Sequence, residues 1–117
     1  MIIIHGEDMG LLTRTEEIIL VTILKLGANA YGVSIREQIH ADTGESWSFA
    51  SIYQPLDKLA RKQYVIKTKG EPTAERGGKS KFFYRVTPEG KGALLRAQET
   101  ARRLWAGVPR ILPENGK

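Results

Sequence analysis

Residues Ser48 to Val65 read SFASIYQPLDKLARKQYV, and this stretch decides the fold of the chain. Ser48 is a residue type that caps helix N-termini, because its side-chain oxygen accepts a hydrogen bond from a free backbone N–H group. Ile52, Leu56 and Leu59 recur at helical spacing and form one apolar stripe. The stretch therefore predicts an amphipathic helix that buries one side.

A second side of this predicted helix carries hydrogen-bond donors. Ser51, Gln54, Lys58 and Lys62 recur on it. Donors on an outward helix face suit the major groove of DNA, where base edges and phosphates offer acceptors. An ordinary solvated surface helix shows the same pattern, so the interpretation depends on the neighbouring sequence.

Two further helices are predicted before this one. Thr13 and Glu16 have the spacing of a capping box. The run Ile18 to Leu26 is apolar on nearly every side, which together with the cap favours a buried helix over a buried strand. A second helix is predicted from about Tyr31 to Thr43, with Gly44 as its stop. The short turn that follows makes the second and third helices a helix-turn-helix.

Pro55 lies inside the third predicted helix, where it removes one backbone hydrogen bond and crowds the carbonyl of Ser51. We expect a first turn, Phe49 to Ile52, that is kinked or 3₁₀ in character. A helix that begins only near Tyr53 is the alternative. Trp47, in the preceding turn, is expected to anchor the core rather than to bind a ligand.

A two-stranded antiparallel hairpin is predicted after the third helix. Residues 64–69 and 81–86 are β-branched or aromatic runs separated by a long glycine-containing connection. Arg76, Lys79 and Lys81 cluster at its tip. We expect these three side chains to contact phosphates, and so to set affinity more than sequence choice.

The basic residues of the chain are concentrated. The formal charge is +5, and nine of the 18 lysines and arginines lie between residues 58 and 85 with only two acids among them. This distribution points to a polyanionic partner. The nine are Lys58, Arg61, Lys62, Lys67, Lys69, Arg76, Lys79, Lys81 and Arg85.

The composition narrows the classes of function. With 117 residues and 41% hydrophobic content, the chain has the size and composition of one globular domain. It has no cysteine, and His5 and His40 are isolated, so we expect no disulfide, no metal, no cofactor and no catalytic set. We read Glu16 and Glu17 as helix-start acids. The sequence shows no signal peptide and no membrane-spanning run, and the default expectation is a cytoplasmic protein.

A last helix is predicted from Thr87, its cap, to about Ala106, with Pro88 at its first position. One stripe of this helix is apolar and carries Trp105 near its end. A second copy of the chain is the usual way to bury such a stripe, so we expect a homodimer. The stripe consists of Leu94, Ala97, Ala101, Leu104, Trp105 and Val108.

Four segments together resemble the PadR family of bacterial transcriptional regulators over roughly residues 11–108. The most specific is RGGKSKFFYRVTPEG at Arg76 to Gly90; the others are TEEIIL at Thr15 to Leu20, AYGV at Ala30 to Val33 and SIYQPLDKL at Ser51 to Leu59. The sequence departs from the family pattern in having Gln54 between the helix tyrosine and the proline.

The resemblance implies an α+β fold, a winged helix-turn-helix of three helices and a two-stranded wing with a C-terminal dimerisation helix. It also implies a homodimeric repressor whose third helix enters the major groove. Tyr53 matches a tyrosine that lies at the DNA surface in such proteins. On this basis residues 1–10 form an N-terminal tail, 11–87 the DNA-binding domain, and 88–117 the dimerisation helix and a C-terminal tail.

The leading hypothesis is therefore a sequence-specific DNA-binding regulator, a repressor that binds a palindromic operator as a homodimer. A small aromatic effector that stacks on paired copies of Trp105 would release it. The alternative is a winged-helix protein–protein interaction module without DNA binding. The concentration of cations on the third helix and hairpin favours DNA, since an adaptor has no need of it.

Overall fold

The computed structural model of this protein describes residues 11–71 and 81–111. These residues form four α-helices, one short 3₁₀ helix and a two-stranded antiparallel sheet, which confirms the predicted α+β winged helix-turn-helix. The elements are α1 (Arg14–Leu26), η2 (Gly27–Asn29), α2 (Gly32–Thr43), α3 (Phe49–Arg61), β1 (Val65–Lys69), β2 (Phe82–Val86) and α4 (Pro88–Trp105).

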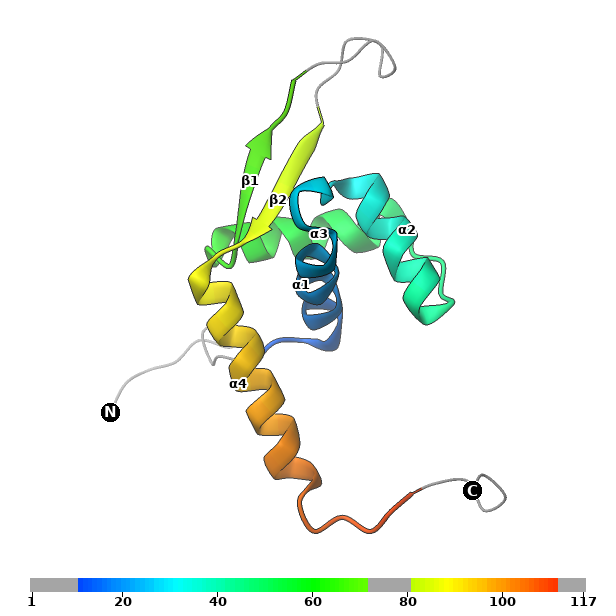
Figure 1. The fold of residues 1–117 in the computed structure, drawn as a ribbon, viewed down its shortest axis with the longest axis vertical. Helices are drawn as coiled ribbons and strands as arrows, with labels where there is room; N and C mark the ends of the chain where they lie inside the picture. The colour runs from blue at the N-terminus through cyan, green and yellow to red at the C-terminus, as the bar shows by residue number, and fades with distance from the viewer. Residues whose placement is uncertain (1–10, 72–80, 112–117) are drawn as a thin grey trace.

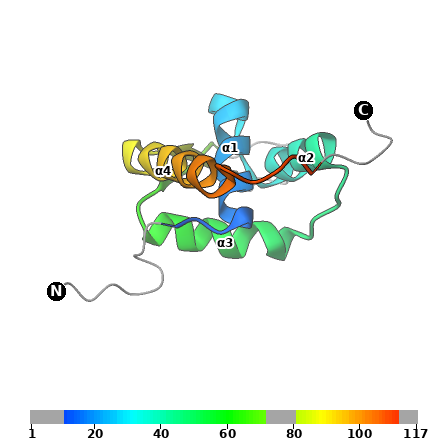
Figure 2. The same ribbon diagram turned by 90° about the horizontal axis from the view of Figure 1, so that it is seen from below.

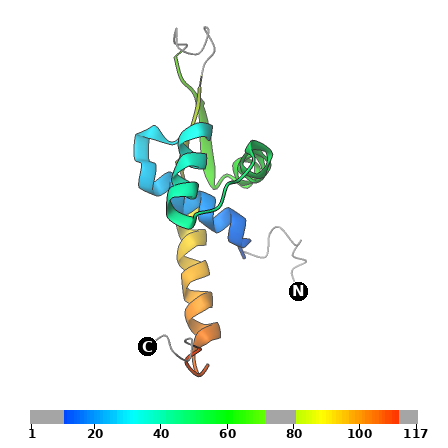
Figure 3. The same cartoon turned by 90° about the vertical axis from the view of Figure 1, so that its right-hand side faces the viewer.

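The hairpin and α4 leave the helical body at opposite ends (Figure 1), and the side view in Figure 3 shows the same separation. Seen from below, α3 runs along one side of the body, with α2 and α4 on the other (Figure 2). Within the described ranges, no helix combines the length and apolar character that crossing a membrane requires.

One core joins all of these elements. It is built on α1, which contacts α2, α3, β2 and α4. Trp47 packs against this core from the turn before α3, as predicted. The largest fully buried side chains are Ile19, Leu20, Ile23, Ile35, Ile39, Ile52, Leu56 and Leu59.

The start of α1 is fixed by the predicted capping box. The backbone N–H of Glu16 donates to Oγ1 of Thr13 at 3.0 Å, and the backbone N–H of Thr13 donates to Oε1 of Glu16 at 2.9 Å. The second oxygen of the same carboxylate, Oε2, accepts from Nζ of Lys62 at 3.1 Å. Because Glu16 is only 2% exposed, this pair ties the first turn of α1 to the end of α3 inside the protein.

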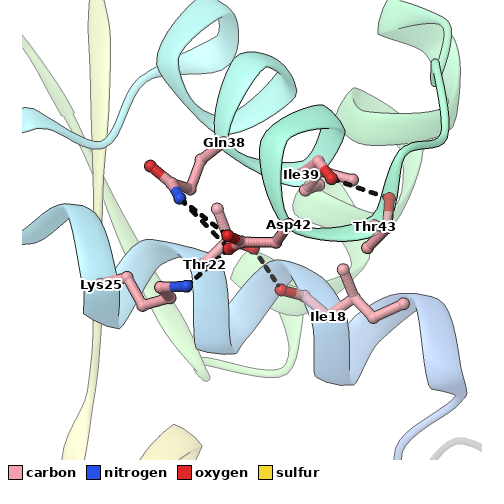
Figure 4. Close-up of polar contacts among 7 residues, drawn as sticks. All are labelled: Ile18, Thr22, Lys25, Gln38, Ile39, Asp42 and Thr43. Atoms are coloured by element: carbon pink, nitrogen blue, oxygen red, sulfur yellow. Dashed lines mark hydrogen bonds and ion pairs between the residues drawn. The ribbon is translucent and has the colours of Figure 1, made fainter.

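A second, exposed cluster joins α1 to α2 (Figure 4). Nζ of Lys25 donates to Asp42 at 2.6 Å, and Nε2 of Gln38 donates to the same carboxylate at 3.2 Å. These hydrogen bonds, that of Lys25 first, hold the pKa of Asp42 below its usual value.

Two expectations about the helices are wrong. The apolar run of α1 is not buried on every side, because Val21 and Leu24 are 42% and 45% exposed. The α3 helix begins at Phe49 and is α-helical throughout, so neither a 3₁₀ first turn nor a start at Tyr53 occurs. A kink at Pro55 stays a prediction. Pro55 stands inside this helix, and the Ser48 cap still fixes its start, with the N–H of Ser51 donating to Oγ of Ser48 at 3.1 Å.

The hairpin pairs β1 with β2 in an antiparallel register in which Val65 is opposite Val86 and Lys67 is opposite Tyr84. Tyr84 and Val86 point into the core and are 4% exposed each. The α4 helix follows at once, capped as predicted by Thr87, whose Oγ1 accepts from the N–H of Gly90 at 3.0 Å.

The ion pair between Glu16 and Lys62 generates a stability prediction. Lys62→Met keeps most of the side-chain volume but leaves the buried Glu16 carboxylate without its counter-ion. We expect the free energy of unfolding to fall by about 2–4 kcal/mol. This loss is slightly smaller than the loss found when one partner of a fully buried pair is removed. Urea denaturation followed by circular dichroism measures this loss.

Lys25→Met is the matched control, because it removes a lysine from an exposed ion pair and should leave the unfolding midpoint near that of the wild type. Equal losses in the two variants would show that burial of Glu16 does not set the cost.

Candidate nucleic-acid interface

The exposed surface of α3 has a crest and two edges. Burial of Ile52, Leu56 and Leu59 fixes the inner side of the helix, and the α-helical period then fixes which residues lie opposite. The crest is formed by four exposed residues, Ala50, Gln54, Asp57 and Arg61.

One edge of α3 borders the first turn of α1. Ser51 and Lys58 lie on it, Ser51 exposed and Lys58 half-buried. Together with Gln54 they line an open hollow of about 380 Å³ whose opposite wall is formed by Thr13 and Thr15. Three of the four predicted donors therefore lie close together, with Gln54 on the crest.

Lys62 differs from the other predicted donors. Its side chain is only 13% exposed, and its ammonium pairs with Glu16. The expectation that it shares an outward face with Ser51, Gln54 and Lys58 is wrong, because a buried carboxylate draws its head group back toward α1.

The other edge of α3 is aromatic and faces α2 and the wing. The rings of Phe49 and Tyr53 stack with centroids 6.1 Å apart, and each residue is about 40% exposed. The guanidinium of Arg36 lies 4.9 Å from the Phe49 ring centroid, while its Nε donates to the carbonyl of Trp47 at 2.6 Å. Arg36 therefore links α2 to the start of α3 and holds Phe49 in place.

The middle of β2 is fixed to the start of α2. The backbone N–H of Tyr84 donates to the carbonyl of Ala30 at 2.9 Å, and the rings of Tyr31 and Phe83 lie 5.5 Å apart. These contacts set the position of the wing relative to the aromatic edge of α3.

Two lysines of the hairpin lie over aromatic rings. Nζ of Lys81 is 4.1 Å from the centroid of Tyr31, and Nζ of Lys67 is 4.4 Å from that of Phe82. Such contacts hold the ammonium groups in place while leaving their hydrogen-bond donors available. Arg76 and Lys79, predicted at the tip, lie outside the described residues.

Tyr84 is the buried tyrosine beside this lysine pair. Burial first, and then the neighbouring Tyr53 and Asp57, raise the pKa of its phenol to about 12. At neutral pH the phenol is protonated, as that of an ordinary tyrosine is, and its hydroxyl can donate a hydrogen bond.

The predicted dimer stripe on α4 divides at its middle. Leu94 is buried against the core and Ala97 is half-buried, whereas Trp105 is 58% exposed. The rest of the stripe, Ala101, Leu104 and Val108, is exposed in a single chain. The core of one copy therefore covers only the first half of the helix.

Several residues of this surface were not predicted from the sequence. The crest residues Ala50, Asp57 and Arg61 could have been found by placing them at the helical angle opposite Leu56. The roles of Arg36 and Lys67 depend on contacts between separate elements, and no local pattern signals them. Within the described ranges, no three histidine or acidic side chains gather into a group that could hold a metal ion.

Comparisons with known proteins agree with this geometry. A family model described as the transcriptional regulator PadR-like family matches residues 19–96, two thirds of the 117-residue chain. No curated protein matches the chain.

Solved structures share the fold. A transcriptional regulator from Clostridium thermocellum is 25% identical with a TM-score of 0.62, over 81% of this chain and 90% of that chain. A PadR family transcription regulator from Clostridium difficile is 24% identical with a TM-score of 0.60, over 78% and 91%. A PadR family transcriptional regulator from Eggerthella lenta is 22% identical with a TM-score of 0.64, over 81% and 80%.

The packing of Tyr53 against α2 can be tested at Gly32. A Cβ at this position would lie 1.9 Å from the Tyr53 hydroxyl, so Gly32→Ala must push the ring outward. Because Tyr53 is 41% exposed and meets the added methyl with the far end of its side chain, we expect little change in unfolding free energy but a clear shift of the Tyr53 ring signals in NMR spectra.

Gly92→Ala in α4 is the control, since its Cβ would make only ordinary contact, 3.5 Å from Arg96. It should raise the unfolding free energy by about 0.5–1 kcal/mol, as glycine replacement inside a helix does. An unmoved Tyr53 ring in Gly32→Ala would contradict the described contact.

Proposed function

The chain belongs to the PadR-like family of transcriptional regulators, which bind DNA, and from that premise we propose that it is a homodimeric repressor of a palindromic operator. The observation that carries the proposal is the exposed crest of α3, which lies beside a hairpin that carries Lys67, Lys69 and Lys81. The repressor acts on DNA in the cytoplasm.

In this proposal the crest of α3 enters the major groove and reads base edges. The Gln54 amide suits the N6 and N7 atoms of adenine, the Arg61 guanidinium suits guanine, and the Asp57 carboxylate suits the amino group of cytosine. Ser51 and Lys58, on the edge beside α1, contact the backbone that borders the groove.

Tyr53 and Lys62, elsewhere on α3, have different roles in this proposal. Tyr53, on the aromatic edge, stacks on Phe49 and presents its face to the DNA. Lys62 contributes by holding α3 against α1 through Glu16, because its ammonium is already paired there.

The wing supplies affinity that does not depend on sequence. Lys81, and with it Arg76 and Lys79 of the hairpin connection, contact phosphates beside the major groove. Each such contact releases counter-ions from the DNA, so binding should weaken steeply as salt rises.

The dimer would form through residues 88–117, and residues 11–87 would bind the DNA. The exposed second half of α4 supports this division, since Trp105, Leu104 and Val108 have no described cover in one copy. A two-fold axis through α4 would present the two α3 helices to half-sites about one helical turn apart. Paired copies of Trp105 at this axis would stack a flat aromatic effector that releases the repressor.

The function is tested by selecting bound fragments from genomic DNA and measuring affinity for the selected site by fluorescence anisotropy. A palindromic consensus, with salt-dependent binding at least a hundredfold tighter than to random DNA, is the expected result. Failure to bind any DNA would contradict the proposed function.

Gln54 tests whether the crest reads bases. Gln54→Ala should weaken binding to the selected site by about 1–3 kcal/mol, the worth of one good bidentate base contact, and leave binding to random DNA nearly unchanged. Glu37→Ala, an exposed change on α2, is the control and should affect neither. Equal losses on both DNAs would make Gln54 a backbone contact instead.

Trp105 tests the dimer. Trp105→Ala removes a large apolar surface from the proposed interface, so sedimentation analysis should show a weakened dimer and anisotropy a matching loss of operator affinity. A wild-type protein that is monomeric at micromolar concentration would refute the interface.

A separate experiment tests whether an aromatic effector binds at Trp105. Planar aromatic compounds should quench tryptophan fluorescence in the wild type and less so in Trp105→Phe, where only Trp47 reports. Identical quenching in the two proteins would exclude Trp105 from the effector site.

A further inference from the structure

The third helix carries a single acidic side chain. Among the 13 residues of α3 the one acid is Asp57, which is exposed on the crest. The residues around it are basic, since Lys58 follows it directly and the strand β1, which packs against α3, carries Lys67 and Lys69. An acid on this surface weakens its attraction to any polyanion, so the position of Asp57 needs a reason.

Support of the helix does not supply that reason. An exposed acid on a helix commonly pairs with a cation three or four residues later. On α4, Glu99 pairs in this way with Arg102 and Arg103. Arg61 stands four residues after Asp57, yet across the residues that the structure describes Asp57 makes no ion pair. Its carboxylate is therefore exposed and available to a partner outside the chain.

A carboxylate discriminates among the groups that DNA presents in the major groove. It accepts hydrogen bonds and donates none, so it is repelled by N7 and O6 of guanine, by O4 of thymine and by every phosphate. The amino group of adenine lies beside the N7 acceptor of the same base, whereas the amino group of cytosine has no such neighbour on its own base. Cytosine is therefore the base that a carboxylate accommodates best.

We propose that Asp57 sets the specificity of the crest by rejection. Its carboxylate admits DNA that places a cytosine amino group opposite it and repels DNA that places an acceptor or a phosphate there. The inference rests on the DNA-binding function proposed above and deepens it. Gln54 and Arg61 add affinity for the right bases, whereas the larger effect of Asp57 is to remove affinity for DNA that lacks the cytosine.

Such a residue offsets the basic character of the molecule. Binding to random DNA is electrostatic, and the nine cations between residues 58 and 85 strengthen it for every sequence alike. Specificity is a difference between two affinities, so it also rises when the weaker affinity falls. An acid that finds a donor only at the right base lowers the affinity for random DNA with little loss at the operator.

The helix fixes where this cytosine should lie. Asp57 follows Gln54 by three residues and precedes Arg61 by four, so their side chains leave α3 about 4.5 and 6 Å apart along its axis. Base pairs repeat about every 3.4 Å along DNA. We therefore expect the cytosine about one base pair from the position that Gln54 reads and about two base pairs from the position that Arg61 reads.

Random DNA provides the first measurement. Asp57→Asn keeps the shape of the side chain and removes its charge, so affinity for random DNA should rise about three- to tenfold at low salt. Affinity for the selected operator should change by a smaller factor, and the ratio of the two affinities should fall. Thermal unfolding should stay close to that of the wild type, because Asp57 is exposed.

Glu37→Gln is the matched control. It removes one negative charge by the same chemical change from an exposed side chain of α2, which lies on the other side of the body from α3 (Figure 2). Its affinity for random DNA should change by less than about twofold. An equal rise in both variants would show that net charge alone is responsible and would overturn the proposal.

The operator provides the second measurement. Each cytosine in turn is replaced by N4-methylcytosine, which still pairs with guanine but has a methyl group where the amino hydrogen faces the major groove. In the wild type, one position per half-site should cost on the order of tenfold, as loss of a hydrogen bond to a charged group does. In Asp57→Ala this cost should largely disappear, whereas the costs at all other cytosines should match those of the wild type.

Three results would overturn the inference or its premise. Random-DNA affinity that does not rise in Asp57→Asn contradicts rejection by the carboxylate. N4-methylcytosine costs that are the same in Asp57→Ala and the wild type at every position contradict the contact with cytosine. Either result, in a protein that still binds its operator specifically, would leave the proposed function intact, whereas absence of any DNA binding by the wild type would overturn both.

Discussion

The buried carboxylate of Glu16 is the constraint on which the position of α3 depends. One of its oxygens closes the capping box of α1, and the other accepts from Lys62 just after the end of α3. A carboxylate that is 2% exposed is expensive to leave unpaired, so both contacts must persist together. The start of one helix and the end of another, 46 residues apart, are thereby held in a single arrangement.

The wing is fixed in a comparable way at its two ends. Gln63, between α3 and β1, adopts a left-handed backbone with φ of 65°, and its carbonyl accepts from the Thr87 hydroxyl at 2.7 Å. On β2, the backbone N–H of Tyr84 donates to the carbonyl of Ala30, just before α2. A non-glycine residue in this conformation costs free energy, which the hydrogen bond to Thr87 helps to offset. The hairpin therefore leaves the body in a direction set by both α3 and α2.

The sequence predicts the parts of this fold that depend on local signals. The caps at Thr13, Ser48 and Thr87, the stop at Gly44 and the hairpin all follow from side chains within a few residues of the feature. The apolar spacing of α3 likewise predicts its buried side. These features together predict the winged helix-turn-helix, whereas the family was predicted from the resemblance of four segments to PadR regulators.

Features that depend on distant contacts were not predicted. Lys62 has the spacing of an outward donor, and only the buried Glu16 explains why it turns inward. Val21 and Leu24 look like core residues because periodicity records apolar character and not what covers it. The small pocket between the start of α2, α3 and the hairpin needs three elements to exist at all, so no local pattern in the sequence predicts it.

The second half of α4 connects stability to the proposed regulation. Only Gly90, Ala93 and Leu94 of this helix are buried, so its last turns extend from the body with apolar residues uncovered. A short helical segment without tertiary contacts is marginal in water, and the pairs of Glu99 with Arg102 and Arg103 support it only weakly because they are exposed. In the proposed dimer the partner copy would supply the missing cover. The same contact would set the distance between the two α3 crests. An effector bound there would therefore change the distance between the two α3 crests without changing either crest. Operator affinity would fall as a result, because the DNA fixes the spacing of the two half-sites.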